Sequence, residues 1–251
     1  MIDVIIPTKD RPVLLHNIIT QIRGNIPGSR IIVVDASASP SPPLLHVEEY
    51  VHLPLATMGA ARQAGLERCI NGFAAYIDDD IIFTPGWYSQ MIRDMGDATV
   101  CSSRVIYGAP VEPTIEKVFR ASVAGHFFSV ASIVDVAKLK AAGGWDCGVH
   151  MAEDTELHHR LPEGQWVISA AEVWHPLSFR QWMGKAWQYS SGAVQLFKHK
   201  GMKDEWLGRR LAQKLSYPFV WGWKSRSLLA FLYIVAYRFV YLCGVARRAL
   251  A

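Results

Sequence analysis

Cysteine is scarce in this chain and is arranged neither for metal binding nor for disulfide pairing. The four cysteines among 251 residues, Cys69, Cys101, Cys147 and Cys243, are widely spaced and form no CxxC pair. This spacing argues against a zinc ribbon and a disulfide scaffold, and it fits a reducing compartment. Neither a GxGxxG fingerprint nor a GxxxxGKS loop follows the first apolar run, so two common nucleotide-binding motifs are missing.

A secretory signal is also lacking at the start of the chain, where Met1 is followed at once by IDVIIP. No basic segment precedes an apolar one there, so we expect a cytoplasmic protein. Apolar residues make up 51% of the chain, which is enough for a sizeable core and argues against wholesale disorder. A length of 251 residues suits one large domain, or one domain with an appendage.

Acidic residues are nearly absent from the end of the chain. Residues 176–251 contain 13 Lys or Arg and two acids, whereas residues 1–175 contain 13 Lys or Arg and 20 acids. Five of the nine tryptophans also lie in the basic segment. This composition favours contact with an anionic surface, with an ordinary basic surface as the alternative. The charges lie among long apolar runs, so we expect a membrane surface and no nucleic acid.

Short apolar runs alternate with helical patterns over the first hundred residues. Strands are expected at 2–6, 31–35, 73–77 and 98–106, and helices at 11–23, 57–70 and 85–95. Asp10 is the expected N-cap of the first helix, with Pro12 in its first turn. This alternation predicts an α/β fold with a doubly wound, mostly parallel sheet, in which nucleotides bind at the carboxyl ends of strands.

The rest of the chain is expected to complete this domain and then to become helical. Further strands are expected at 125–134, 166–169 and 171–174, further helices at 135–142 and 153–161, and tail helices at about 179–199, 204–214 and 225–248. We therefore predict a domain over residues 1–178 and a basic, aromatic-rich helical tail over residues 179–251.

Three consecutive acids, Asp78, Asp79 and Asp80, end the apolar run AAYI. Their carboxylates repel one another, and no basic residue adjoins them in the sequence. A fold tolerates such a cluster at a strand end when a divalent cation or an Arg or Lys partner neutralises it. A solvated acidic turn is the alternative interpretation.

Several short motifs together resemble those of the family 2 glycosyltransferases of the GT-A fold. They are VIIPT at 4–8, IVVD at 32–35, GAARQAG at 59–65, DDD at 78–80, GGWD at 143–146, EDTEL at 153–157, and His175. Their order and spacing carry the resemblance, which covers about residues 1–176. It implies a Rossmann-like sheet with helices on both faces, a nucleotide-sugar half at about 1–106 and an acceptor half at about 107–178.

The resemblance also implies roles for individual residues. Those expected to bind the nucleotide sugar are Pro7, Thr8, Asp10, Asp35, Arg62, Asp78 and Asp79. Those expected at the acceptor or the sugar are Trp145, Asp146 and Glu153. Asp80 and His175 are the expected ligands of Mn²⁺ or Mg²⁺, and Asp154 is the expected catalytic base.

Other interpretations of four of these residues stay open. Asp154 can be a helix-terminus acid that favours the macrodipole, and His175 a loop histidine without a metal. Arg62 can be a surface helix residue, and Trp145 a core residue in place of a platform for a sugar. The chain also departs from the family's pattern, because Ala36 follows Asp35 where a second acid is usual.

The implied activity is an inverting, metal-dependent transfer of one sugar from a nucleoside-diphosphate sugar to an acceptor hydroxyl on a glycan or lipid-linked acceptor. No QxxRW follows His175, which favours a single transfer over processive synthesis. A nucleotidyltransferase is one rival, although it would need a glycine-rich loop after the first strand, which is lacking here. A non-catalytic, membrane-associated binding protein of the same fold is the other.

The segment 227–245 is apolar but is interrupted by Arg238. Basic residues flank it at both ends, whereas a spanning helix prefers its positive flank on one side. This pattern favours a helix in the membrane interface, with Trp221, Trp223 and Tyr241 at headgroup depth. We therefore expect a peripheral enzyme on the inner face of the cell membrane. A helical appendage packed on the domain and a homodimer contact are alternatives.

Overall fold

The computed structural model describes residues 1–251 apart from 42–45, 122–128, 150, 201–223, 225–226 and 250–251. It divides into two compact units. One unit comprises Met1–Val105 and Gly125–Trp174, and the other comprises Ile106–Ala124 and His175–Ala251. The expected boundary at residue 178 stays a prediction, and the expected tail helix at 204–214 lies outside the described residues.

The described strands form one mixed sheet in the order β3-β2-β1-β4-β7-β6-β8-β5. Four neighbouring strands run parallel: β1 (Asp3–Thr8), β2 (Arg30–Asp35), β3 (Glu49–His52) and β4 (Phe73–Ile77). The others are β5 (Ile82–Phe83), β6 (Val100–Tyr107), β7 (Ala131–Asp135) and β8 (Trp166–His175). Strand β7 is antiparallel to β4 and β6, and β5 is antiparallel to β8. The expected α/β fold on a mostly parallel sheet is confirmed.

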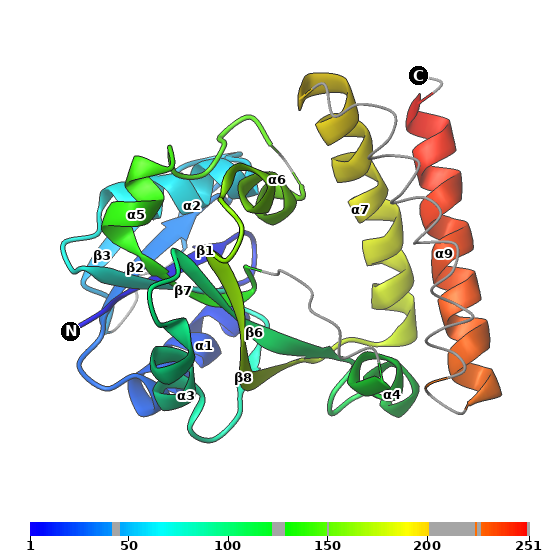
Figure 1. The fold of residues 1–251 in the computed structure, drawn as a ribbon, viewed down its shortest axis with the longest axis horizontal. Coiled ribbons are helices and arrows are strands. Elements are labelled where there is room, and N and C mark those ends of the chain that lie inside the picture. Colours follow the sequence, from blue (N-terminus) through cyan, green and yellow to red (C-terminus); the bar gives the residue numbers. More distant parts are fainter. Residues whose placement is uncertain (42–45, 122–128, 150, 201–223, 225–226, 250–251) are drawn as a thin grey trace. The chain divides into compact units, whose positions relative to one another are not determined.

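Helices cover both faces of this sheet in the first unit. In Figure 1, α1 (Pro12–Asn25) and α3 (Trp87–Met95) lie on one side. On the other side lie α2 (Met58–Glu67), α5 (Val136–Ala141) and α6 (Glu153–Arg160). Side chains alternate between the faces along each strand. Ile5 of β1 therefore joins the core cluster that includes Leu66 of α2 and Leu157 of α6.

The glycines of the GAARQAG segment allow α2 to approach its neighbours closely. A Cβ at Gly65 would clash with the Ile5 side chain of β1, and a Cβ at Gly59 would clash with the carbonyl oxygen of Asp146. Thr57 caps the helix, because its hydroxyl accepts a hydrogen bond from the Ala60 N–H at 2.9 Å. Helix α2 is thus fixed against β1 and against the loop that contains Asp146.

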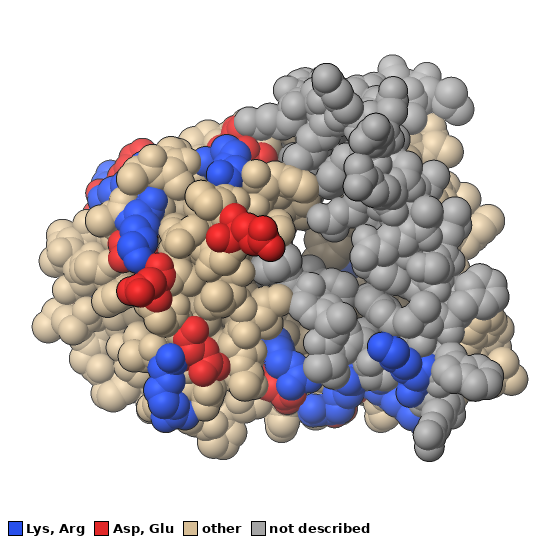
Figure 2. All heavy atoms as spheres, viewed as in Figure 1, with Lys and Arg blue, Asp and Glu red and all other residues tan. Residues whose placement is uncertain are grey.

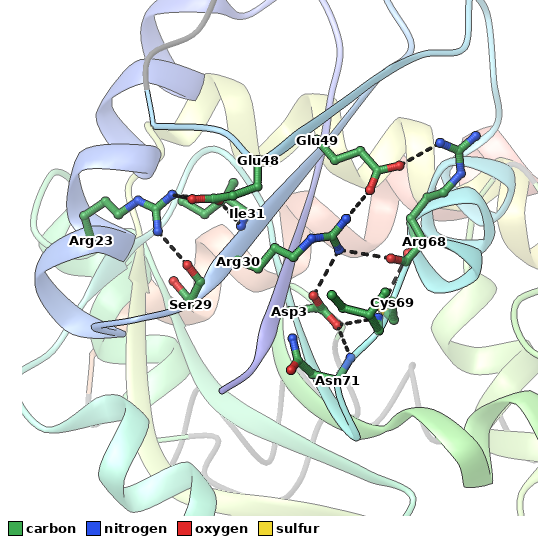
Figure 3. Close-up of polar contacts among 12 residues, drawn as sticks. Asp3, Arg23, Ser29, Arg30, Ile31, Glu48, Glu49, Arg68, Cys69 and Asn71 are labelled. Carbon is green, nitrogen blue, oxygen red and sulfur yellow. Dashed lines mark hydrogen bonds and ion pairs between the residues drawn. The ribbon is translucent and has the colours of Figure 1, made fainter.

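A network of ion pairs fastens the amino ends of the parallel strands (Figure 3). Asp3 of β1 is fully buried, and its carboxylate accepts hydrogen bonds from Arg30 at 3.1 Å and from the Ile70 and Asn71 N–H groups at 2.9 and 2.8 Å. Arg30 also pairs with Glu49 of β3. These contacts join β1, β2 and β3 at the amino edge of the sheet and do not involve its carboxyl edge.

Several element boundaries differ from the sequence-based expectation. The N-cap of α1 is Arg11, not Asp10, because Asp10 has a positive φ of 55° and makes no cap hydrogen bond. Strand β3 and helix α4 (Pro113–Ala121) were not expected. The two short strands expected from residue 166 are one continuous strand, β8. The edge strand β3 has no fully buried residue and includes Glu49 and His52, so its sequence lacks a long apolar run.

The second unit contains α4, α7 (Phe179–Lys200) and α9 (Leu228–Ala249). Helices α7 and α9 run side by side in the same direction (Figure 1). The rings of Phe179 and Tyr233 lie 4.2 Å apart, and those of Trp182 and Tyr237 lie 4.6 Å apart. Nearer the other end, Arg248 donates to the Trp187 carbonyl oxygen at 3.0 Å. The expected helical tail is therefore present as a packed pair of helices.

Charged side chains of both signs lie next to one another on the face of the first unit shown in Figure 2. Among the described residues of this unit, ion pairs such as that between Arg23 and Glu48 join charges of opposite sign. The acids on the face shown in Figure 2 do not form one continuous acidic surface.

Candidate active site

The candidate site lies where the direction of the sheet's strand order reverses. Strand β1 pairs in parallel with β2 on one side and with β4 on the other. In open α/β sheets such a switch point leaves a crevice outside the carboxyl ends of the strands, where ligands bind. Thr8 ends β1, Asp35 ends β2, and Asp78–Asp80 follow β4. We call these three acids the acid triplet.

Two arginines and a threonine contact the acid triplet. Thr8 donates its hydroxyl to Asp79 at 2.7 Å. Arg11 donates from Nη1 to Asp79 at 3.0 Å and to Asp80 at 2.8 Å. Arg62 of α2 donates to Asp78 at 3.1 Å. The sequence places no basic residue beside the triplet, but the fold brings two guanidinium groups to it, so the solvated acidic turn is wrong for Asp79, which is 6% exposed.

The pKa of Asp79 is raised from its ordinary value. Burial is the main cause, because it disfavours the charged form, and the neighbouring Asp80 adds to the effect. The hydrogen bond from Thr8 and the charge of Arg11 oppose it. Asp79 is thus an internal member of the triplet, whereas the side chains of Asp78 and Asp80 keep partial exposure, at 20% and 18%.

Arg62 connects the triplet to the EDTEL segment. Its side chain is only 2% exposed, so the surface alternative is wrong. One guanidinium nitrogen donates to Asp78, and the other donates to Glu153 of α6. Burial alone would lower the pKa of Arg62, but the charges of Glu153, Asp78 and Asp154 outweigh it and raise the pKa. Arg62 therefore stays charged and holds carboxylates from two different elements together.

Asp154 lies beside this ion-pair cluster. Its Oδ1 accepts the Thr155 N–H at 2.7 Å, and it also accepts the backbone N–H of Ser129. The pKa of Asp154 is raised, chiefly by burial, while the charge of Arg62 opposes the shift and that of Asp78 supports it. The Val130 carbonyl oxygen accepts the Asp78 N–H at 2.8 Å, so one short segment of chain contacts both acids.

Two residues expected at the acceptor or the sugar are internal instead. Trp145 is 2% exposed, packs edge-on against Tyr76 at 5.2 Å and lies 5.2 Å from the Arg62 guanidinium carbon. This burial supports the core alternative for Trp145, because its ring offers no exposed face to a sugar. Glu153 is 6% exposed and is bound to Arg62, so it is an ion-pair partner, and its expected role at the sugar or the acceptor stays a prediction.

Gln63 and Asp146 shape the loop that follows α5. Gln63 accepts the Trp145 N–H at 2.9 Å, and its side chain lies so close to Gly144 that a Cβ there would clash. Asp146 accepts the Gly148 N–H at 2.8 Å. Gln63 thus ties the GGWD loop to α2. The expected role of Asp146 at the acceptor stays a prediction.

Asp35 is buried and is hydrogen-bonded within its own half of the sheet. Its carboxylate accepts both the N–H and the hydroxyl of Ser37, both those groups of Ser41, and the hydroxyl of Tyr50 at 2.7 Å. Burial would raise the pKa of Asp35, but these hydrogen bonds outweigh it and hold the pKa far below its ordinary value. A contact to a nucleobase, as expected from the sequence, would have to replace one of these donors.

The loop after β1 is hydrogen-bonded to Ser37, which is also a partner of Asp35. Pro7 is buried within β1, opposite Val34 of β2, so it shapes the strand from inside. Asp10 donates its N–H to the hydroxyl of Ser37 at 2.7 Å, and its side chain is exposed. Of the expected nucleotide-binding residues here, Thr8 donates its hydroxyl to Asp79, and the side chain of Asp10 faces solvent.

His175 belongs to the second unit. Its ring stacks on Tyr107 at 4.8 Å, and its Nε2 lies 3.2 Å from the Lys185 ammonium. An ammonium group against Nε2 disfavours a metal on that nitrogen, which supports the alternative of a histidine without a metal. The expected pairing of His175 with Asp80 at one metal stays a prediction.

The acids of the first unit suit a hard divalent cation that takes only one or two of its ligands from the protein. Among the described residues, no group of three His, Cys, Asp or Glu side chains is placed to hold a metal ion. However, five carboxylates, from the acid triplet, Glu153 and Asp154, face only two guanidinium groups in the contacts above. Mg²⁺ and Mn²⁺ need only one or two carboxylates when diphosphate oxygens and water complete the shell, so the partly exposed Asp80 and Asp78 suit this role.

Sequence reasoning missed Arg11, Ser41 and Tyr50 as parts of this site. Arg11 follows the end of β1 by three residues, and a basic residue close behind a strand is a signal that could have linked it to the acids. Tyr50 lies in β3, which was not expected, so its contact with Asp35 could not be foreseen.

Comparisons with known proteins agree with this geometry. Residues 3–118 match the family model described as glycosyl transferase family 2. The pre-mycofactocin glycosyltransferase of Mycobacterium tuberculosis H37Rv is 26% identical over 229 residues, covering 78% of this chain and 47% of that protein. The chain therefore spans about half the length of the curated relatives that it matches first.

Two solved structures share the fold. A mannosyltransferase of Pyrobaculum calidifontis, in complex with GDP-Man and Mn²⁺, matches with a TM-score of 0.66 at 13% identity, covering 96% of this chain and 86% of that one. GalNAc-T7 with UDP, GalNAc and Mn²⁺ matches with a TM-score of 0.54 at 12% identity, covering 70% and 44%. With the motif order and the sheet topology, these matches show that the chain has the GT-A fold and that its residues 3–118 are similar to the glycosyl transferase family 2.

Proposed function

We propose that this protein is an inverting, metal-dependent glycosyltransferase that moves one sugar from a nucleoside-diphosphate sugar to an acceptor hydroxyl. The observation that carries the proposal is the bridge formed by Arg62, which pairs with Asp78 and Glu153 and interacts with Asp154. This bridge supports one site in which the triplet binds the donor and Asp154 meets the acceptor. The solved structures with GDP-Man, UDP and Mn²⁺ support a nucleotide sugar and a divalent cation.

Asp154 is the proposed general base. An acceptor hydroxyl is a weak nucleophile, so a positioned carboxylate that takes its proton accelerates the attack by typically ~10²–10⁴-fold. A base works best when its pKa approaches the working pH, and burial raises the pKa of Asp154 in that direction. Attack from the face opposite the leaving diphosphate inverts the anomeric centre.

Asp80 is the proposed metal ligand, with Asp78 nearer the ribose. A bound Mn²⁺ or Mg²⁺ would stabilise the negative charge that develops on the departing diphosphate. Arg62 cannot replace such a cation, because Glu153 and Asp78 already engage its two terminal nitrogens. The acceptor is proposed to be a glycan or a lipid-linked alcohol, and the enzyme is proposed to act in the cytoplasm.

Donor hydrolysis and transfer test this proposal directly. The purified chain is screened with a panel of nucleotide sugars in Mn²⁺, Mg²⁺ or EDTA, and nucleoside diphosphate release is measured. The expected result is release with at least one donor, loss of release in EDTA, and near-complete loss in Asp80→Asn and Asp154→Asn. Asp97→Asn, at an exposed position outside the site, is the matched control and should keep full activity.

The same assay separates the rivals. A non-catalytic binding protein would bind a nucleotide sugar without releasing the diphosphate, and its binding would survive Asp154→Asn. A nucleotidyltransferase would release inorganic pyrophosphate from a nucleoside triphosphate. Either result would contradict the proposed transfer.

The second unit is proposed to rest on the inner face of the cell membrane through α9. Leu228–Arg248, at 21 residues and a mean hydropathy of 2.0, is long and apolar enough to cross a membrane. However, Ala230, Ile234 and Tyr241 are buried on one side of α9, which packs on α7. Since α7 contains Arg180 and Lys185 in its first turns, the pair could not cross together at low cost.

The opposite face of α9 supports an interfacial position. Leu228, Leu232, Val235 and Phe239 are exposed and recur at helical spacing, so they form one apolar stripe. An apolar stripe on a basic segment suits the surface of a membrane with anionic lipids. Tyr241 is 5% exposed, so the expectation that its ring lies among the headgroups is wrong; Trp221 and Trp223 lie outside the described residues.

Vesicle flotation tests this position. The full chain should float with vesicles of phosphatidylcholine and phosphatidylglycerol, and less with phosphatidylcholine alone. The double variant Leu232→Glu/Phe239→Glu should stay at the bottom, whereas Ile92→Glu, at an exposed position of α3, should float like the parent. Equal flotation of all three proteins would show that α9 is not the part of the protein that contacts the membrane. A loss of flotation together with a change from dimer to monomer would instead indicate a homodimer contact.

A further inference from the structure

Arg11 contacts the same carboxylate that the proposed function assigns to the metal. Its Nη1 lies 2.8 Å from Asp80 Oδ2 and 3.0 Å from Asp79 Oδ1. The side chain of Arg11 is 48% exposed, whereas those of Asp79 and Asp80 are 5% and 18% exposed. A solvent-accessible cation on a long side chain thus bridges two acids that are held more firmly by the fold.

We infer that Arg11 is a positioning residue that neutralises Asp80 while the donor site is empty and transfers its guanidinium to the donor diphosphate when metal and nucleotide enter. This inference rests on the proposed function, because it takes Asp80 as the metal ligand. It adds one step to the proposed function, namely an exchange of one cation for another on the same carboxylate.

Electrostatics favours such an exchange. Two cations on one carboxylate repel each other, so Asp80 releases Arg11 when a divalent ion is bound there. Asp79 does not depend on Arg11 alone, because the Thr8 hydroxyl donates to its other oxygen at 2.7 Å. The departure of Arg11 from Asp80 therefore leaves no buried acid without a hydrogen bond.

The position of Arg11 in the chain supports the donor diphosphate as the next partner of its guanidinium. Arg11 is the N-cap residue of α1, a helix of 14 residues whose amino end lies beside the carboxyl end of β1. The amino end of a helix favours anions, and a guanidinium matches phosphate oxygens in its geometry. An incoming diphosphate thus offers Arg11 a stronger partner than the Asp80 carboxylate.

Arg62 provides the contrast within the same site. It is 2% exposed and is engaged by acids on both terminal nitrogens, so burial and two ion pairs hold it in place. The two arginines therefore have different roles. Arg62 holds the acids in place, and Arg11 changes its ion-pair partner.

Metal binding without nucleotide tests the inference. Free Mn²⁺ is counted by electron paramagnetic resonance during titration of the parent, Arg11→Ala, Arg11→Lys and Asp80→Asn. Arg11→Ala should bind Mn²⁺ alone more tightly, by about fivefold, because a half-exposed ion pair of ordinary strength no longer competes. With Mn²⁺ present, the same variant should bind GDP and UDP more weakly, by about tenfold, since one phosphate contact is lost. Arg11→Lys should lie between the two in both assays.

Arg68→Ala is the matched control, because Arg68 is 51% exposed and pairs with a glutamate at the opposite edge of the sheet. It should change neither affinity. Failure of Arg11→Ala to gain Mn²⁺ affinity, while Asp80→Asn loses it, would overturn the exchange and leave the proposed function intact. Unchanged Mn²⁺ binding in Asp80→Asn would instead refute the metal site of the proposed function.

Discussion

Arg62 of α2 and Glu153 of α6 form a buried ion pair that joins the helix after β3 to the helix that carries Asp154. Between these residues lie 90 positions of sequence, so the pair depends on the whole sheet being assembled. The second terminal nitrogen of Arg62 reaches Asp78 at 3.1 Å. A single buried side chain thereby sets the spacing between the acids proposed for the donor and the acid proposed for the acceptor.

Truncation of Arg62 should destabilise the protein strongly. Arg62→Ala leaves Glu153 buried without its partner, and breaking a buried pair in this way costs about 3–5 kcal/mol. The double variant Arg62→Met/Glu153→Gln removes both charges and keeps the volume, so it should recover part of the loss. Urea unfolding of Arg62→Met, Glu153→Gln and the double variant measures the coupling. Additive losses, with no recovery in the double variant, would show that the pair does not act as a unit.

The proposed base should give the reaction a distinctive pH dependence. Burial raises the pKa of Asp154 above the ordinary aspartate value of about 3.9. Only the carboxylate form accepts a proton, so kcat/KM should fall as the pH decreases through this raised pKa, at a higher pH than an ordinary aspartate would give. Asp154→Asn should lose about 10²–10⁴-fold in kcat and show no such limb. A limb that persists in Asp154→Asn would assign the titration to another group.

The sequence predicted the parts of this protein that depend on local pattern. The apolar runs at 2–6, 31–35 and 73–77 were enough to place three parallel strands, although β1 continues through Pro7 to Thr8, beyond its expected end. The partners of Arg62, by contrast, could not be assigned from local pattern. Whether an arginine in a helix faces water or a glutamate 91 positions away is decided by tertiary packing, which periodicity does not encode.

Edge elements and loops show the same limit. Strand β3 carries Tyr50 to Asp35, yet its four residues show no clear alternation, because an edge strand is half exposed. Helix α4 lies in a segment whose sequence gave no interpretation. Trp145 was ambiguous for another reason: an aromatic ring beside a proposed sugar site and one in the core have the same sequence context, and only its 2% exposure separates them.

Asp35 should contribute stability that depends on pH. Its pKa is lowered in the folded state, so the contribution is complete above the unfolded value of about 3.9 and is lost as the pH falls toward the folded value. At neutral pH, Asp35→Asn turns an amide N–H₂ toward hydroxyl and N–H donors. The substitution should lower the free energy of unfolding by about 1–3 kcal/mol. Urea unfolding between pH 7 and pH 3 should show the parent and the variant converging below about pH 4. A constant difference would exclude a charged Asp35 as the cause.

Asp3 offers a test of an acid that is structural and not catalytic. Asp3→Ala leaves the N–H groups of Ile70 and Asn71 without their acceptor and removes one acceptor of Arg30, which keeps Glu49 and the Arg68 carbonyl oxygen (Figure 3). Each unsatisfied buried donor costs about 1–3 kcal/mol, so the unfolding free energy should drop by roughly 3 kcal/mol or more. Donor hydrolysis per folded molecule should stay unchanged, since this network lies at the amino edge of the sheet. A selective loss of hydrolysis would show that the two edges are coupled.

Two helical glycines should respond to the same substitution in opposite directions. A Cβ at Gly65 would clash with the Ile5 side chain of β1, so Gly65→Ala should force α2 away from the sheet and cost about 1–3 kcal/mol. No atom lies within 4 Å of a Cβ built at Gly24 in α1, so Gly24→Ala should stabilise the protein by about 0.4–1 kcal/mol through the unfolded chain. Because Arg62 is one turn from Gly65 in α2, Gly65→Ala should also lower donor hydrolysis, whereas Gly24→Ala should not. Thermal unfolding and the hydrolysis assay on both variants decide this, and equal behaviour of the two would show that close packing of α2 on β1 does not position the site.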